Sequence, residues 1–313
     1  MKKYPEKNTE EHGVFNFTIN GKKSWAKLFQ SKDIFEPLVK KIFEKEKIEF
    51  SLLYNLTPGT NAVFRVNDKV IKIYAPVESG FYEQDYFTIE REALLHANSL
   101  HIAVPRIHAA GTICDTYIFH YIIMDFISGR EAGNILLSFT DEQKKDFALQ
   151  FKNITKKLNI KTNKQISVIS IERCQNNKKW NNFPESFREA RKNLIKNLSR
   201  DDFVYVHGDL TAENIIIDDN KKIHIIDFAD SLIAPYYYEW PPLVFSLFNS
   251  DPVMLKAYFG NYKHDSFIEQ LTASILIHEY GADFTKQLCD LSNFPVEKLV
   301  DTNILNLLIK NSC

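Results

Sequence analysis

Residues Val204–Phe228 read VYVHGDLTAENIIIDDNKKIHIIDF, and this stretch contains the most informative spacing in the chain. Asp209 comes just after a strand-like run, Asn214 follows five residues later, and Asp227 comes thirteen residues after Asn214. Apolar runs flank the polar segment Asp218–Lys221, which predicts a hairpin with its turn there. The three polar side chains should therefore lie at strand ends that face one cleft.

Two carboxylates and one amide at this spacing are what phosphoryl transfer from a nucleotide requires. Kinases place an Asp that accepts the proton of the attacking hydroxyl five residues before an Asn, and a second Asp-Phe after a hairpin. We assign Asp209 as the general base, and Asn214 and Asp227 as ligands of Mg²⁺, which prefers hard oxygen donors. His207 is expected to brace the turn by hydrogen bonds and to give structural support.

Composition and charge narrow the class of protein. The 313 residues carry a net charge of −1, with 44% hydrophobic and 25% charged residues, which is an ordinary globular composition and argues against nucleic-acid binding. Residues 201–313 hold 17 acidic side chains against 7 lysines and no arginine, a net of −10, whereas the preceding 200 residues sum to +9. The acidic last third favours a cationic acceptor.

The ends and the cysteines of the chain bear on its location. Residues 1–13 are charged and polar, and no apolar run approaches the length of a membrane span, so we expect neither a secretory signal nor a membrane partner. The four cysteines are scattered without metal-binding spacing. We therefore expect reduced thiols and a cytoplasmic protein.

The order of patterns along the chain predicts an α+β fold with two lobes, as in protein kinases. Residues 1–124 alternate strand-like segments with one inserted helix and should form a small β-rich nucleotide-binding lobe, preceded by a helical extension over 31–46. Residues 125–129 end in Gly129 and are expected to be a hinge. Residues 130–313 are mainly helical and should form the larger catalytic and substrate-binding lobe.

Lys72 alternates out of an apolar strand and is expected to reach nucleotide phosphates. Kinases pair this lysine with a glutamate of the following helix. Glu90 and Glu92 are the candidates, and we prefer Glu92 because Leu94 and Leu95 would then share the adjoining core-facing surface.

Two further segments are candidates for nucleotide contact. Gly59 and Thr60 lie between two predicted strands, where a loop covering the phosphates would be, although a G-x-G-x-x-G pattern is missing. Met124 and Phe126, at the predicted hinge, are expected beside the adenine ring.

The sequence resembles the aminoglycoside phosphotransferase family within the protein-kinase-like superfamily. Val204–Phe228 resembles that family's signature, Glu92–Leu95 with Val104–Gly111 resembles its helix and following strand, and Ile123–Gly129 resembles its hinge. The resemblance implies ATP or GTP as donor, Mg²⁺, and a small-molecule hydroxyl as acceptor. Where the family has an Asp that anchors the helical lobe, this chain has Glu239, which we expect to keep that structural role.

Two departures from the sequence pattern of protein kinases indicate which class of kinase this is. Gly208 stands where protein kinases have an Arg, and the interval after Asp227 is too short for a peptide platform. A small-molecule O-phosphotransferase is therefore preferred, with an aminoglycoside as the favoured acceptor and antibiotic resistance as an open role. Choline or ethanolamine, a sugar and a macrolide remain alternatives, as do a nucleotide-binding pseudokinase and an enzyme that transfers AMP.

Overall fold

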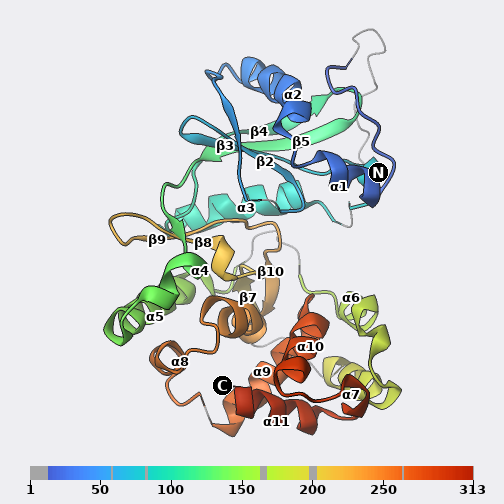
Figure 1. The fold of residues 1–313 in the computed structure, drawn as a ribbon, viewed down its shortest axis with the longest axis vertical. Coiled ribbons are helices and arrows are strands. Elements are labelled where there is room, and N and C mark those ends of the chain that lie inside the picture. The colour runs from blue at the N-terminus through green and yellow to red at the C-terminus, as the bar shows by residue number, and fades with distance from the viewer. Residues whose placement is uncertain are drawn as a thin grey trace. The chain divides into compact units, whose positions relative to one another are not determined.

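The computed structural model describes residues 13–57, 59–81, 84–162, 168–196, 203–262 and 264–312. Within these residues the chain forms two compact units (Figure 1). The first comprises Met1–Asn98 and Val104–Ser128, and the second comprises Ser99–Ala103 and Gly129–Cys313. We call them the N-terminal unit and the C-terminal unit.

The N-terminal unit is built on one antiparallel sheet of five strands in the order β1-β2-β3-β5-β4. The strands are β1 (Leu53–Asn55), β2 (Ala62–Val66), β3 (Lys69–Ile73), β4 (Ile107–Cys114) and β5 (Ile118–Asp125). Every second side chain of β2 is buried, which is the alternation expected of a strand with one covered face. Asn67 begins the tight β2–β3 turn with a φ of +56°, a conformation that Asn tolerates.

Helices accompany this sheet, and one of them supplies a continuous apolar stripe. They are α1 (Lys22–Leu28), α2 (Lys32–Lys45) and α3 (Tyr86–Ser99), with a short 3₁₀ turn at η1 (Val77–Ser79). The buried side chains of α2 recur at helical spacing and join the sheet in one core; they are Phe35, Leu38, Val39, Ile42 and Phe43. The helix expected over 31–46 is α2, whereas α1 has one buried side chain and therefore showed no periodicity.

The C-terminal unit is mainly helical and also contains two small sheets. Its helices are α4 (Ala132–Ile135), α5 (Asp141–Leu158), α6 (Ile171–Gln175), α7 (Glu185–Lys196), α8 (Pro252–Phe259), α9 (Asp265–Ile277), α10 (Gly281–Leu291) and α11 (Thr302–Ser312). Short helical turns are η2 (Leu136–Ser138), η3 (Lys178–Asn182), η4 (Ala212–Asn214), η5 (Tyr236–Glu239), η6 (Pro242–Leu247) and η7 (Val296–Lys298). The strands are β6 (Arg130–Glu131), β7 (Phe203–Val206), β8 (Ile215–Ile217), β9 (Ile223–Ile225) and β10 (Leu232–Pro235).

Local signals explain where several of these elements begin. Thr140 and Gln143 form a reciprocal capping box at the start of α5, as their spacing predicts. Asp251 caps α8, whose first residue is a proline, a position where the missing N–H costs nothing. None of the helices in the described part of the chain has the length and apolar run that a bilayer span requires.

The Lys- and Asn-rich segment 161–179 has weak periodicity, which predicts a surface loop or an insertion, but part of it is helical. Residues 163–167 lie outside the described residues, but the segment continues into α6 and then η3. Trp180 of η3 is buried, and the Arg191 guanidinium lies 4.6 Å from the centre of its ring. Because one tryptophan and one arginine provide the packing here, the apolar periodicity that signals a helix is absent.

Candidate active site

The central piece of the site is the β7–β9 segment of the C-terminal unit. Strand β7 pairs with β10, and β8 pairs with β9 and β6, so the intervening loop is held between two small sheets. The Ile226 N–H donates to the Asn214 carbonyl over 3.0 Å, which extends the hairpin to the residue before Asp227. The Asp218–Lys221 turn is closed by the Lys221 N–H, which donates to the Asp218 carbonyl over 2.9 Å.

Gly208 gives the loop between β7 and β8 a backbone conformation that residues with a side chain rarely adopt. Its φ is +89°, and a Cβ placed there would lie 2.2 Å from the Asp230 carbonyl oxygen. The arginine found here in protein kinases would clash with that carbonyl. The absence of the arginine, noted in the sequence, therefore has a steric cause in this loop.

His207 joins the two halves of the hairpin and is fully buried. Its Nδ1 accepts a hydrogen bond of 3.2 Å from the Asp209 N–H, so Nε2 carries the proton and donates to the Ile226 carbonyl over 3.0 Å. One imidazole ring thus connects the residue expected to be the base with the residue before Asp227. This is the bracing position that the sequence suggested for His207.

Glu239 holds the same loop from the opposite side. Its Oε1 accepts hydrogen bonds of 2.8 Å from the His207 N–H and 2.8 Å from Asn159 Nδ2, and Nδ2 also donates to the Tyr205 carbonyl over 3.0 Å. Burial raises the pKa of Glu239 to about 7, although both hydrogen bonds act to lower it. Glu239 therefore anchors the loop backbone, and Asn159 at the end of α5 is a partner that the sequence did not reveal.

His278 is a second residue that sequence reasoning missed. It is buried, its Nδ1 accepts from the Tyr280 N–H over 3.1 Å, and Nε2 donates to the Gly208 carbonyl over 3.1 Å. Its ring stacks on Tyr238 at 4.6 Å between centroids, and burial lowers its pKa to about 3, so the ring is neutral. Because it lies 70 residues from Gly208, no local spacing could have predicted this contact.

Two of the three residues expected to perform the chemistry, Asp209 and Asn214, lie in this loop between β7 and β8, and the third, Asp227, follows β9. Asn214 Nδ2 donates to the Asp209 Oδ2 over 3.0 Å and to the Asp209 carbonyl over 2.9 Å, which leaves the Asn214 Oδ1 as its donor oxygen toward a ligand. Burial and, after it, the negative charges of Asp230, Asp227 and Glu213 together raise the pKa of Asp209 to about 7. Asp227 has a φ of +59°, a rare conformation for a residue with a side chain.

The donor set suits Mg²⁺ rather than a softer metal. Asn214 and Asp227 offer oxygen atoms, and the mutual repulsion felt by Asp209 is what a bound cation would relieve. Among the described residues, no three His, Cys, Asp or Glu side chains converge to hold a metal by themselves. Two protein ligands fit a site in which nucleotide phosphates complete the coordination.

Lys72 of the N-terminal unit pairs with Glu90, so the preference for Glu92 is wrong. Lys72 Nζ lies 2.7 Å from Glu90 Oε2, both side chains are almost completely buried, and the Tyr74 hydroxyl donates to the same oxygen over 2.5 Å. Glu92 is half exposed and lies 2.8 Å from Arg91 NH2.

The error comes from the face assigned to helix α3. Its buried side chains are Phe87, Glu90, Ala93, Leu94, His96 and Ala97. Leu95, used to place Glu92 toward the core, is 48% exposed. Glu90 lies three residues after Phe87 and four before Leu94, on the buried stripe, whereas Glu92 lies beside it.

Gly59 and Thr60 lie in the loop between β1 and β2, and both are exposed. A Cβ at Gly59 would have no atom within 4 Å, so folding does not require glycine there. The Thr60 carbonyl accepts a hydrogen bond of 2.8 Å from the indole N–H of Trp25.

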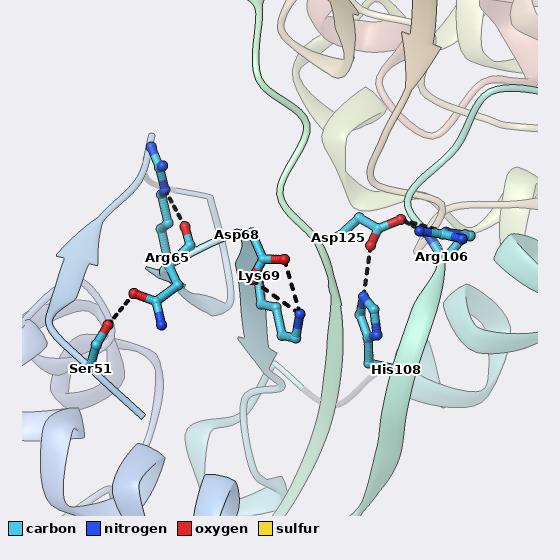
Figure 2. A network of polar contacts seen from close by, with 8 residues as sticks. Ser51, Arg65, Asp68, Lys69, Arg106, His108 and Asp125 are labelled. Carbon is cyan, nitrogen blue, oxygen red and sulfur yellow. Dashed lines mark hydrogen bonds and ion pairs between the residues drawn. The ribbon is translucent and has the colours of Figure 1, made fainter. Parts of the chain in front are cut away.

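Met124 is buried near the end of β5, and the next residue, Asp125, is held by the side chains of Arg106 and His108. Asp125 Oδ2 lies 3.0 Å from Arg106 Nε, and Oδ1 lies 2.7 Å from His108 Nε2 (Figure 2). Burial acts to raise the pKa of Asp125, but hydrogen bonds from Arg106 and His108 outweigh it and the pKa is lowered. The start of the expected hinge is therefore an ordered, ionised carboxylate.

Phe126 is held by the β2–β3 turn. Its N–H donates to the Asp68 carbonyl over 2.8 Å, and the Arg65 guanidinium lies 3.8 Å from the centre of its ring. The Asp125 N–H is also used, since it donates to the Arg106 carbonyl over 3.0 Å. A base that binds along this segment would therefore have to take its donor from Ile127 or beyond.

Residues 168–269 match the family model APH, described as the phosphotransferase enzyme family. The resemblance to the aminoglycoside phosphotransferase family is confirmed. The matched range contains the supported loop with Asp209, Asn214 and Asp227. No curated protein sequence matches the chain.

Solved structures with the same fold extend over nearly the whole chain. The GDP complex of aminoglycoside 2'-phosphotransferase-IIIa aligns with a TM-score of 0.58 at 17% identity, covering 90% of this chain and 99% of that one. The streptomycin–ATP–APH(2")-IIa ternary complex gives 0.54 at 14% identity, with coverages of 88% and 96%. A choline/ethanolamine kinase family protein from Mesorhizobium loti gives 0.52 at 14% identity, covering 93% of each chain. The expected protein-kinase-like α+β fold, a small sheet-rich unit and a larger helical unit, is therefore confirmed.

Proposed function

We propose that the protein is a small-molecule kinase that transfers the γ-phosphoryl group of ATP or GTP to a hydroxyl group. The loop that joins Asp209 to Asn214, with Asp227 close enough to raise the pKa of Asp209, carries this proposal. The match of residues 168–269 to the phosphotransferase family supports it, as do the nucleotide complexes among the related folds.

Asp209 acts as the general base. The acceptor hydroxyl oxygen forms a bond to the γ-phosphorus while the bond to the bridging oxygen of the leaving nucleoside diphosphate breaks, and Asp209 takes up the hydroxyl proton. The hydrogen bond from Asn214 to Asp209 Oδ2 leaves Oδ1 to receive it. His207, Glu239 and His278 fix the backbone around this carboxylate, so the reacting geometry is set before substrates bind.

Asn214 and Asp227 would hold Mg²⁺ through their side-chain oxygens. The ion supplies charge neutralisation for the phosphates when it is bound. In the N-terminal unit, Lys72 presents its ammonium group from a buried pair with Glu90, an arrangement that keeps the lysine charged and oriented for phosphate oxygens.

The acceptor is a cationic small molecule, with an aminoglycoside as the first candidate. Residues 201–313 have a net charge of −10, and Glu213 and Asp230 add negative potential at Asp209. Such steering weakens with salt. An apparent acceptor affinity that stays flat as salt is raised would favour a neutral sugar or macrolide instead.

A panel of acceptors tests the proposal directly. The purified protein is incubated with Mg²⁺, with ATP or GTP, and with one acceptor at a time from a panel of aminoglycosides, choline, ethanolamine, sugars and macrolides. The mass of each product is measured by mass spectrometry. We expect one acceptor to gain the mass of a phosphoryl group. A gain of AMP would replace the proposal with adenylyl transfer, and nucleotide binding without any product across the panel would favour a pseudokinase.

A further inference from the structure

The loop between β1 and β2 contains fewer glycines than is usual for a loop that covers nucleotide phosphates. Its one glycine is Gly59, whereas kinase loops of this kind carry three in a G-x-G-x-x-G pattern. Such a loop depends on external supports to hold its backbone N–H groups toward a ligand.

Trp25 of helix α1 provides the first support. It is the one buried side chain of α1, and its indole N–H donates to the Thr60 carbonyl over 2.8 Å. The ring is fixed by Phe35, edge-on at 5.8 Å, and by Phe29, stacked at 6.0 Å between centroids. The indole N–H of Trp25 is therefore fixed in position, and it holds the Thr60 carbonyl in place.

Asn61, the next residue, provides the second support. Its Oδ1 accepts a hydrogen bond of 3.1 Å from the Ala75 N–H, just beyond β3. Helix α1 is itself fixed at its start, because Ser24 Oγ donates to the Gly21 carbonyl over 2.7 Å and accepts from the Asn20 N–H over 2.8 Å. The β2 end of the loop is thus attached on one side to α1 and on the other to the strand that carries Lys72.

We propose that Trp25 is a positioning residue for nucleotide binding, acting through the hydrogen bond from its indole N–H to the Thr60 carbonyl. This inference rests on the proposed kinase function. By ordering the loop before the nucleotide arrives, the bond removes part of the ordering cost from the binding step. Helix α1 is in this view an added support that compensates for the missing glycines.

Three variants separate the hydrogen bond from the packing of the ring. Trp25→Phe keeps an aromatic ring and removes the N–H, whereas Trp25→His keeps an N–H at the corresponding ring position and loses the second ring. Trp180→Phe is the matched control, because Trp180 is equally buried and its indole N–H has no acceptor among the described residues.

MgATP and MgGTP affinities are measured by calorimetry, and hydrogen exchange at residues 59–61 is measured without nucleotide. Loss of one hydrogen bond should weaken nucleotide binding about 2- to 12-fold in W25F. Exchange at these residues should become faster, and kcat should stay within about twofold of the wild type, because the bond orders the loop for binding and takes no part in the chemical step. W180F should match the wild type. W25H should melt at a lower temperature than W25F yet bind nucleotide more tightly, an order that loss of stability alone cannot produce.

Equal nucleotide affinity in the wild type and W25F, or unchanged exchange at residues 59–61, would overturn the role of Trp25 and leave the kinase proposal standing. A wild type that binds neither nucleotide would overturn the kinase proposal itself. If W25F does not fold, W25H decides: affinity within about twofold of the wild type supports the inference, and a larger loss contradicts it.

Discussion

Replacing His278 by glutamine should change how the stability of the C-terminal unit depends on pH. Glutamine can still donate its amide N–H to the Gly208 carbonyl, as His278 Nε2 does, but it loses the acceptor for the Tyr280 N–H and does not titrate. The substitution therefore removes a proton-binding site from the unfolded chain and keeps the hydrogen bond to the Gly208 carbonyl.

The magnitude follows from the shifted pKa of His278. Burial lowers this pKa from the ordinary value of 6.5 to about 3. A base with a lowered folded-state pKa contributes its full stability above the unfolded value and loses it as pH falls. Near pH 5 the unfolded chain binds a proton that the folded state excludes, which costs about 2 kcal/mol at about 1.4 kcal/mol per pH unit.

Glu239 responds in the opposite direction, so the wild type alone does not isolate His278. Burial raises the pKa of Glu239 to about 7, and its contribution is present at low pH and lost as pH rises through that value. Subtracting the wild type from the variant at each pH cancels this contribution and leaves that of His278.

Urea unfolding followed by tryptophan fluorescence measures the difference in the free energy of unfolding between H278Q and the wild type, since Trp180 and Trp240 both lie in the C-terminal unit. From pH 8 to about pH 5, the stability of H278Q relative to the wild type should rise by about 2 kcal/mol. His101 is exposed and has a φ of +57°, a conformation that asparagine also tolerates. His101→Asn is therefore the control, and it should show no such rise. A pH-independent difference between H278Q and the wild type would refute the reasoning.

Three more outcomes follow from the structure. Asp227→Ala should remove Mg²⁺-dependent nucleotide binding, and calorimetry showing normal MgATP affinity would exclude the ligand role. Glu90→Gln removes the buried charge that pairs with Lys72 and should cost about 3–5 kcal/mol in urea unfolding, against about 0–1 kcal/mol for Glu92→Gln; equal costs would contradict the pairing. Gly208→Ala forces a Cβ against the Asp230 carbonyl at positive φ and should destabilise the protein by about 2–4 kcal/mol; a wild-type melting temperature would show that the loop can relax.

The parts of the fold that sequence predicts are those in which neighbouring residues carry the signal. The capping box at Thr140 and the hairpin around Asp218 each depend on spacings of a few residues, and the structure shows both. Alternation and a short turn also predict the pairing of β2 with β3, but not that of β3 with β5, because α3 and β4 lie between these two strands in the chain.

Contacts between residues far apart in the sequence could not be predicted from such local spacings. The hydrogen bonds of His278 and Asn159 to the loop join residues 70 and 46 positions apart in the chain, and nothing in either local sequence marks them. The choice of Glu92 over Glu90 failed because it relied on Leu95 being buried, and helix α3 turns that side chain to solvent. Trp25 was missed because a helix with one buried residue has no period to detect.

The central claim is that Asp209 takes the proton of an acceptor hydroxyl in a loop that also holds magnesium. Single-turnover phosphorylation by Asp209→Asn, compared with Asp219→Asn in the exposed hairpin turn, tests it most directly. The account predicts a rate about 10²- to 10⁴-fold lower for D209N with MgATP affinity retained, and a wild-type rate for D219N. A wild-type rate in D209N would contradict it.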